Sequence, residues 1–90
     1  MLFEYDENKS MSNKQKHGID FEEAKLLWDD VNLVEIDVAY EGEPRYVAIG
    51  TIGKKHWSVV ITHREEIIRI ISARCSREKE VDIYDQDNNN

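Results

Sequence analysis

Residues 56–74, HWSVVITHREEIIRIISAR, decide the fold because they contain two apolar runs separated by a tight turn at Arg64-Glu65. In residues 56–63, large apolar side chains occupy alternate positions, which is the spacing of one face of a β-strand. Residues 66–74 carry pairs of consecutive isoleucines, so both faces of this second strand are apolar, as in a strand with neighbours on either side. The segment predicts two adjacent strands near the centre of a sheet.

Two further strands precede this pair. Residues 34–40 alternate between apolar and polar side chains, and residues 45–51 are rich in apolar and β-branched residues, with residues 41–44 as the turn between them. Gly53-Lys54-Lys55 closes a hairpin into residues 56–63. Because these strands follow one another through short connections, the sequence predicts an antiparallel meander.

The N-terminal third predicts a short strand and two helices. Residues 2–5 read as the strand, and residues 7–17 as an almost wholly polar helix that ends at Gly18 in a left-handed cap. Asp20 and Glu23 form a capping box for a second helix, whose apolar face is expected to cover the sheet.

A last helix follows the strand at residues 66–74. Ser76 is expected to cap it, and Val81 and Tyr84 share the side through which it docks. The order β-α-α-β-β-β-β-α predicts an α+β fold, an antiparallel meander with two N-terminal helices and one C-terminal helix packed on one face. The domain is expected to span residues 1–84, with a disordered acidic and Asn-rich tail at residues 85–90.

Length and composition restrict the class of protein. The 90 residues fit one small core, since so short a chain buries only about 60% of its unfolded surface. No apolar run approaches the roughly 20 residues that span a bilayer, so we expect a cytoplasmic protein without membrane association. Cys75 is the only cysteine, which excludes an internal disulfide and a cysteine-based metal cage. We expect no metal and no cofactor.

The charge is unevenly distributed along the chain. The net charge is −7, yet residues 54–79 carry 7 basic and 3 acidic side chains, whereas residues 1–53 carry 5 basic and 12 acidic ones. A basic segment between acidic ones can form a local positive surface for phosphates, and the acidic remainder repels nonspecific nucleic acid or meets a basic partner. A solvated surface of mixed charge is the alternative.

Three arginines at intervals of five are the first candidates for chemistry. Arg69 lies within a run of isoleucines, where a guanidinium requires a partner or a wet cleft. A salt bridge to a helix carboxylate such as Glu22 or Glu23 would satisfy it, and a phosphate would do so equally. Because strand side chains alternate, Arg69 faces away from Arg64 and Arg74 unless a bulge or turn intervenes.

Cleavage of RNA without a metal requires a base for the 2′-OH, an acid for the leaving 5′-oxygen and cations for the phosphate. Glu65, next to Arg64, is the candidate base, and a solvated turn carboxylate is its simpler interpretation. Histidine is a common acid or base in catalysis, and His17 and His63 are the candidates, although His17 also suits a helix C-terminal cap. Motifs for nucleotide-phosphate loops, dinucleotides, serine nucleophiles and zinc proteases are absent.

Four stretches in order resemble the BrnT family of toxins, and the resemblance covers about residues 2–84. They are Phe3-Glu4-Tyr5-Asp6 with Asn8-Lys9; residues 13–24 with Lys16-His17-Gly18-Ile19-Asp20-Phe21; Arg45-Tyr46-Val47-Ala48-Ile49-Gly50; and Ile68-Arg69-Ile70-Ile71-Ser72-Ala73-Arg74, followed by a polar helix start and Tyr84.

The resemblance implies a RelE-like fold and an endoribonuclease that inhibits translation, within a type II toxin-antitoxin system. It also implies a BrnA-type antitoxin with a ribbon-helix-helix domain, through which the toxin meets DNA only indirectly. By position, Arg64, Glu65 and Arg69 become the catalytic group. Supporting or RNA-contacting residues are Lys16, His17, His63 and Arg74.

A second function remains open from the sequence, namely a catalytically silent binding module within an antitoxin-containing transcriptional repressor complex. The charge of −7 favours this alternative. The two hypotheses differ in geometry, because an enzyme needs its cations within reach of a single phosphate, whereas a binding module does not.

Overall fold

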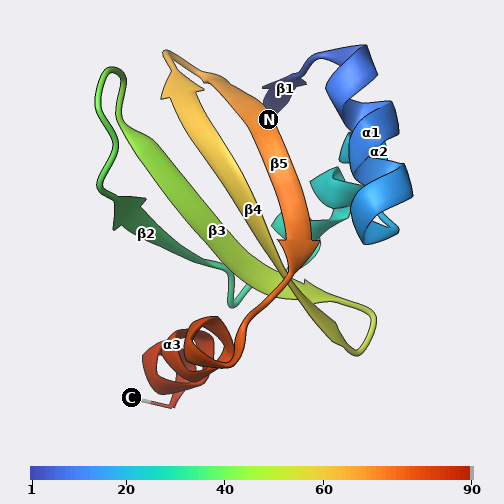
Figure 1. Cartoon of the computed structure of the whole chain (residues 1–90). Helices are drawn as coiled ribbons and strands as arrows, with labels where there is room; N and C mark the ends of the chain where they lie inside the picture. The colour runs from blue at the N-terminus through green and yellow to red at the C-terminus, as the bar shows by residue number, and fades with distance from the viewer. Residues whose placement is uncertain (90) are drawn as a thin grey trace.

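The computed structural model describes residues 1–89, which form a five-stranded sheet and three α-helices (Figure 1). The elements are β1 (Leu2–Glu4), α1 (Glu7–His17), α2 (Phe21–Ala24), the 3-10 helix η1 (Lys25–Asp29), β2 (Val34–Val38), β3 (Arg45–Ile52), β4 (Lys55–Arg64), β5 (Ile67–Cys75) and α3 (Glu78–Asn88). The α+β class predicted from the sequence is confirmed.

The sheet has the strand order β1-β5-β4-β3-β2. Strands β2 to β5 form the expected antiparallel meander, but β1 pairs with β5 in parallel, with Leu2 opposite Ile67 and Glu4 opposite Arg69. The prediction of an antiparallel sheet was therefore wrong at this edge. Parallel neighbours need a long crossover, and the whole chain between β1 and β5 supplies one.

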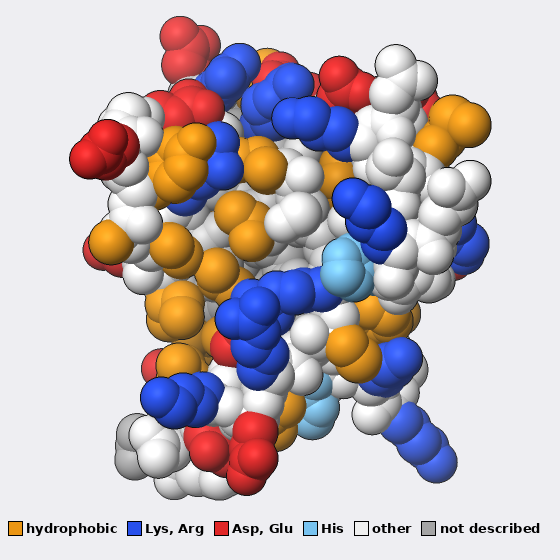
Figure 2. Space-filling model, viewed as in Figure 1, with side chains coloured by type: hydrophobic (Ala, Val, Ile, Leu, Met, Phe, Trp, Pro, Cys, Tyr) orange, Lys and Arg blue, Asp and Glu red, His pale blue; other side chains and the backbone are white. Residues whose placement is uncertain are grey.

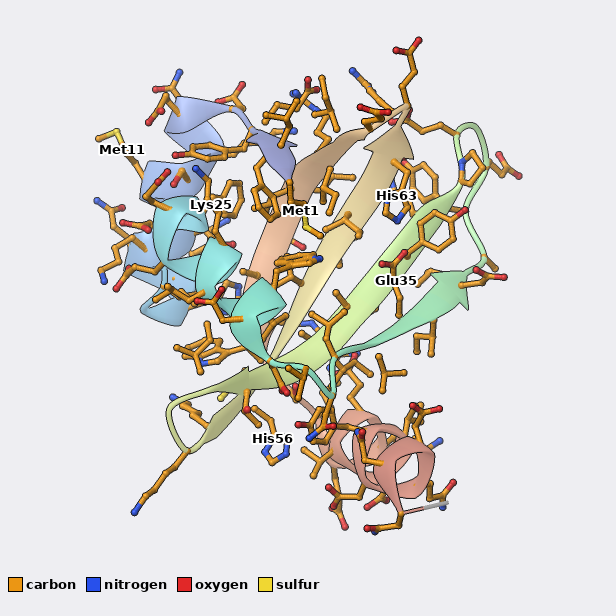
Figure 3. The ribbon with its side chains drawn as sticks, turned by 180° about the vertical axis from the view of Figure 1, so that it is seen from behind. Met1, Met11, Lys25, Glu35, His56 and His63 are labelled. Atoms are coloured by element: carbon orange, nitrogen blue, oxygen red, sulfur yellow. The ribbon has the colours of Figure 1, made fainter. Side chains whose placement is uncertain are left out.

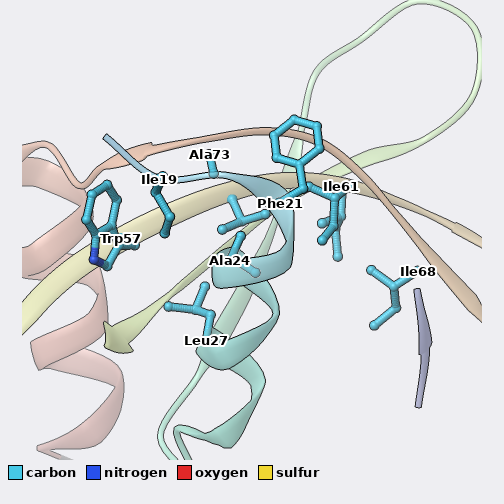
Figure 4. Packing of buried hydrophobic residues seen from close by; sticks show 11 residues of the cluster. Ile19, Phe21, Ala24, Leu27, Trp57, Ile61, Ile68 and Ala73 are labelled. Carbon is cyan, nitrogen blue, oxygen red and sulfur yellow. The ribbon is translucent and has the colours of Figure 1, made fainter. Parts of the chain in front are cut away.

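One face of the sheet, called the covered face below, packs against α2 and η1. Phe21, Ala24 and Leu27 are buried against apolar side chains of β4 and β5, as Figure 4 shows. Gly50 on β3 lets Leu27 approach closely, since a Cβ there would lie 3.1 Å from two side-chain atoms of Leu27. The face predicted for the second helix is confirmed, and it supplies the main core.

The helix α3 packs on the opposite face, so the expectation that all helices share one face was wrong. Tyr84 is buried there with Val34, Val47 and Ile49 of β2 and β3. Because β3 is apolar on both sides, its second face also needs a cover. The Tyr84 hydroxyl donates to Asp30 Oδ2 at 2.8 Å, which anchors α3 to the segment before β2.

The helix α1 lies along the edge of β5 that β1 leaves unpaired. The side chain of Asn13 is buried, and its Nδ2 donates to the backbone oxygens of Ile19 and Ala73, each at 2.8 Å. Its Oδ1 accepts from the Ala73 backbone N–H at 3.2 Å. The Asn13 side chain thus makes the hydrogen bonds to the Ala73 backbone that a neighbouring strand would otherwise make.

The cap predictions were correct at the N-terminus and partly wrong at the C-terminus. Gly18 ends α1 with φ +79°, and Asp20 forms the expected capping box with Glu23. The cap of α3 is Arg77 and not Ser76, because the Ser76 hydroxyl bonds to that of Ser58 on β4.

The C-terminal helix is longer than the sequence suggests. It continues through Asn88, so residues 85–88 are helical where a disordered tail was expected. Asn88 Nδ2 donates to the Asn32 backbone oxygen at 3.1 Å and fastens the helix end. Residue 90 lies outside the described residues. No helix in the described part of the chain is long and apolar enough to cross a membrane.

Candidate functional site

A two-residue turn and a β-bulge in β5 together bring the spaced arginines to one side of the sheet. Ile61 pairs with Ile70 while its neighbour Val60 pairs with Ser72, so Ile71 is an extra residue in β5. This insertion reverses the alternation, and Arg69 and Arg74 consequently face the same way. Arg64 shares that side because it lies two residues from Thr62, the partner of Arg69.

We call this side the arginine face, defined by Arg45 on β3, Arg64 on β4, and Arg69 and Arg74 on β5. It is the face that α2 and η1 leave open and that α3 covers only in part (Figure 1). Figure 2 shows Lys and Arg side chains around apolar side chains on the corresponding surface. The sequence analysis allowed a bulge or a turn to group these arginines: the two-residue turn after Arg64 brings Arg64 and Arg69 to one side, and the bulge at Ile71 adds Arg74.

Two of the arginines converge on a single carboxylate. Arg69 Nη1 donates to Glu4 Oε2 at 2.8 Å, and Arg64 Nη1 lies 3.6 Å from the same oxygen. Arg64 Nη2 also lies 3.4 Å from Glu43 Oε1. The carboxylate that compensates Arg69 is thus Glu4 of β1. The expected bridge to Glu22 or Glu23 is wrong. Glu22 binds Lys25 and Glu23 binds Lys14 instead.

Arg74 is engaged with the last helix. Its Nη1 and Nη2 donate to the two carboxylate oxygens of Glu80 at 2.6 and 2.8 Å, in a bidentate pair. The hydrogen bonds from Arg74 lower the pKa of Glu80 to about 2, against the opposing effect of burial, with a further contribution from the Arg77 backbone N–H. The same pair raises the pKa of Arg74. Arg74 therefore helps to hold α3 on the sheet.

Glu65 lies in the two-residue turn between β4 and β5, beside Arg64. Its φ of +58° is the only positive value at a non-glycine residue within residues 1–89, and its side chain is exposed. No hydrogen bond or ion pair to Glu65 occurs in the described part of the chain. The turn is close to Arg64 in sequence, but the carboxylate in direct contact with Arg64 and Arg69 is that of Glu4.

His63 lies on the covered face, away from the arginines. Its Nε2 is 2.5 Å from Glu35 Oε1, and its ring meets that of Tyr46 edge to face. Figure 3, which views the molecule from behind, shows Glu35 and His63 side by side there. Alternation along β4 separates His63 from Arg64 even though the two are adjacent in sequence.

Lys16 and His17 border the arginine face from the side of α1. A shallow hollow is lined by Lys16 and His17 of α1 together with Ile71 and Ser72 of β5. His17 is exposed in the last turn of α1. Of the two candidate histidines, His17 is the one near the β5 bulge.

Three residues that sequence reasoning did not single out belong to this site. Thr62 is fully buried in the centre of the face and donates to the Pro44 backbone oxygen at 2.8 Å. Glu4 and Arg45 lie on strands on either side of β4 and β5. Arg45 could have been found only from the side-chain alternation of β3, and Glu4 only from the pairing of β1 with β5. A parallel pairing of distant strands leaves no signal in the local sequence.

Within residues 1–89, no three His, Cys, Asp or Glu side chains gather closely enough to hold a metal ion. The described polar groups of the arginine face are guanidinium, carboxylate and hydroxyl groups. Guanidinium groups in a planar fork match the oxygens of phosphates.

The fold and the site together define a small α+β protein with a guanidinium-lined sheet face suited to phosphate groups. The family model for the ribonuclease toxin BrnT of type II toxin-antitoxin systems matches residues 5–80. The chain belongs to this family of ribonuclease toxins, which confirms the resemblance found in its sequence. Among curated proteins, none matches the chain.

Proposed function

We propose that this protein is a metal-independent endoribonuclease that inhibits translation by cutting RNA at the arginine face. A RelE-like arrangement of the sheet is part of the proposal. The toxin is neutralised by a BrnA-type ribbon-helix-helix antitoxin, and it meets DNA only through that partner. Arg64, Arg69 and one carboxylate beside them carry the reaction.

The convergence of Arg64 and Arg69 on Glu4 Oε2 is the observation that carries the proposal. Two guanidinium groups that reach one carboxylate oxygen can also reach one phosphate, whose oxygens have similar spacing. Arg69 has 31% and Arg64 51% of its side chain exposed, so a ligand has access to both. The enzyme hypothesis required this convergence.

The reaction follows from these positions. A carboxylate takes the 2′-OH proton, the 2′-oxygen forms a bond to phosphorus, and the bond from phosphorus to the 5′-oxygen breaks. Arg64 and Arg69 stabilise the charge on the phosphate oxygens, and the 5′-oxygen receives its proton from His17 or water. The products are a 2′,3′-cyclic phosphate and a 5′-OH. Glu4 joins Glu65 as a candidate base because it touches both arginines.

The binding-module alternative rests on a specific observation. Within residues 1–89, Arg64, Arg69 and Arg74 all have carboxylate partners in the chain itself, so their charge is already compensated. A module that only binds an antitoxin does not require these arginines to be released. In an enzyme, a phosphate must replace Glu4 as the partner of Arg64 and Arg69, which costs the existing ion pairs.

Cleavage of RNA by the purified protein in the presence of EDTA distinguishes the two functions. We expect fragments with 2′,3′-cyclic phosphate ends from the wild type, and a loss of about a hundredfold for Arg69→Ala and for Arg64→Ala. Glu4→Gln and Glu65→Gln are compared to identify the base. The substitution that causes the larger loss of cleavage marks the glutamate that acts as the base. Matched controls are Lys54→Ala, which removes a remote surface cation, and Glu66→Gln, which alters the other turn glutamate.

Thermal unfolding shows whether each variant is folded. A folded wild type that leaves RNA intact contradicts the nuclease and favours the binding module. Cleavage that depends on Mg²⁺ and leaves 5′-phosphate ends contradicts the metal-independent mechanism.

A further inference from the structure

Arg45 is the arginine of the arginine face without a carboxylate partner. Within residues 1–89 it makes no ion pair, whereas the other three arginines of this face each end on a carboxylate. Its guanidinium carbon lies 3.7 Å from the centroid of the Tyr40 ring. Its Nε is buried and has no hydrogen-bond partner. Stacking on Tyr40, and not hydrogen bonding, therefore positions this cation.

The position of Arg45 in the sheet connects it with the proposed phosphate site. Thr62 pairs with Arg69 on one side, and Tyr46 pairs with Ile61 on the other, so the antiparallel register places Arg45 next to Thr62. Neighbouring strands lie about 4.8 Å apart, which puts the backbone of Arg45 about 10 Å from that of Arg69. A nucleotide adjacent to a phosphate at Arg69 can therefore reach Arg45.

Tyr40 extends this row beyond the end of β2. Tyr40 is 53% exposed even though the guanidinium of Arg45 lies over its ring. Tyr40 and Arg45 both line a hollow, together with Asp37, Val38 and Pro44, among others. An exposed aromatic ring with a cation stacked on it suits a flat ligand with a negative group.

We propose that Tyr40 and Arg45 form a nucleotide platform, in which Tyr40 stacks on an unpaired RNA base and Arg45 donates to the phosphate of that nucleotide. The platform rests on the proposed function, since it positions the nucleotide next to the scissile phosphate. A base can stack on a side chain only when it is free of its own neighbours, so the platform selects single-stranded RNA. Because any base can stack on the ring, the platform distinguishes single-stranded from double-stranded RNA and not one base from another.

Binding of a 2′-O-methyl decanucleotide, which cannot be cut through its 2′-oxygens, tests the platform by fluorescence anisotropy. A set of such probes carries one abasic position each. We expect one position at which base loss weakens binding to the wild type about tenfold. This sensitivity should persist in Tyr40→Phe, which keeps the ring, and vanish in Tyr40→Leu. Arg45→Gln should weaken binding of every probe more than Lys54→Gln, the matched loss of a remote cation.

The outcomes separate the platform from the nuclease. If loss of the base at that position weakens binding to folded Tyr40→Leu as much as to the wild type, the platform is overturned. Cleavage of RNA by the wild type would still support the proposed function in that case. Equal effects of Arg45→Gln and Lys54→Gln overturn the role of Arg45. A wild type that neither binds nor cuts RNA overturns both proposals together.

Discussion

At the scale of single residues, the surroundings of a side chain decide its chemistry more than its neighbours in sequence do. His63 and Arg64 are consecutive, yet one lies on the covered face with Glu35 and the other on the arginine face with Glu4. Sequence reasoning recognised the arginines by their residue type and spacing. It could not identify Glu4, because a carboxylate 65 positions from Arg69 gives no local signal.

The Arg74–Glu80 pair predicts a dependence of stability on pH. The pKa of Glu80 in the folded protein is about 2, below that of an unfolded glutamate near 4.5, so its stabilising effect is complete above about pH 4.5 and is lost as the pH falls toward 2. Allowing for solvent screening, Glu80→Gln should cost about 2 kcal/mol at pH 7.

Urea unfolding of both proteins between pH 2 and 7 measures this effect. The difference between wild type and Glu80→Gln should shrink as the pH falls. The control is Glu78→Gln on the same helix, where no ion pair lies within the described residues. A difference that stays constant across the range would contradict the assignment to Glu80.

At the scale of elements, caps and periodicity were sufficient for most boundaries. The C-terminal end of α1 at Gly18 and the capping box at Asp20 were predictable because each depends on two or three neighbouring residues. The bulge at Ile71 was not predictable in the same way. It depends on how β5 is aligned with β4, and the isoleucine run fits either face.

The attachment of α1 to β5 provides a prediction for an element. Asn13→Ala removes both hydrogen-bond donors and the acceptor that meet Ile19 and Ala73, and leaves those backbone groups unpaired in a buried place. We expect a loss of about 2–3 kcal/mol in the free energy of unfolding. The amide of Ala73 should also exchange its hydrogen faster.

Ser12→Ala, at the exposed neighbouring position, is the matched control and should change stability little. An Asn13→Ala variant as stable as this control would show that α1 is held by other contacts. Hydrogen exchange read at Ala73 separates local loosening of α1 from global unfolding.

At the scale of the whole molecule, the excess of acidic residues coexists with a face rich in arginines, most of which are paired with carboxylates of the chain. The counts of charged residues along the chain indicated a basic segment at residues 54–79. They carried no information on which face of the sheet its side chains would occupy. The parallel β1 and the position of α3 on the second face also escaped the sequence analysis, because both are decided by which apolar surfaces remain uncovered once the meander has formed.

This arrangement predicts a modest dependence of RNA binding on salt. If Arg45, Arg64 and Arg69 contact phosphates, a plot of log affinity against log salt should have a slope near −2, from about −0.7 per phosphate on a single strand. Anisotropy titrations at several KCl concentrations measure the slope. Arg45→Gln should make it shallower by about 0.7. A flat plot would contradict phosphate binding at this face.

The pairing of β1 with β5 has a consequence for synthesis of the protein on the ribosome. Glu4 is made early and Arg69 late, so the pair that defines the site forms only after most of the chain has been translated. A nascent toxin lacks the β5 arginines until then, and long-range pairing of this kind forms slowly. The order of translation therefore delays formation of the proposed site until β5 has been made.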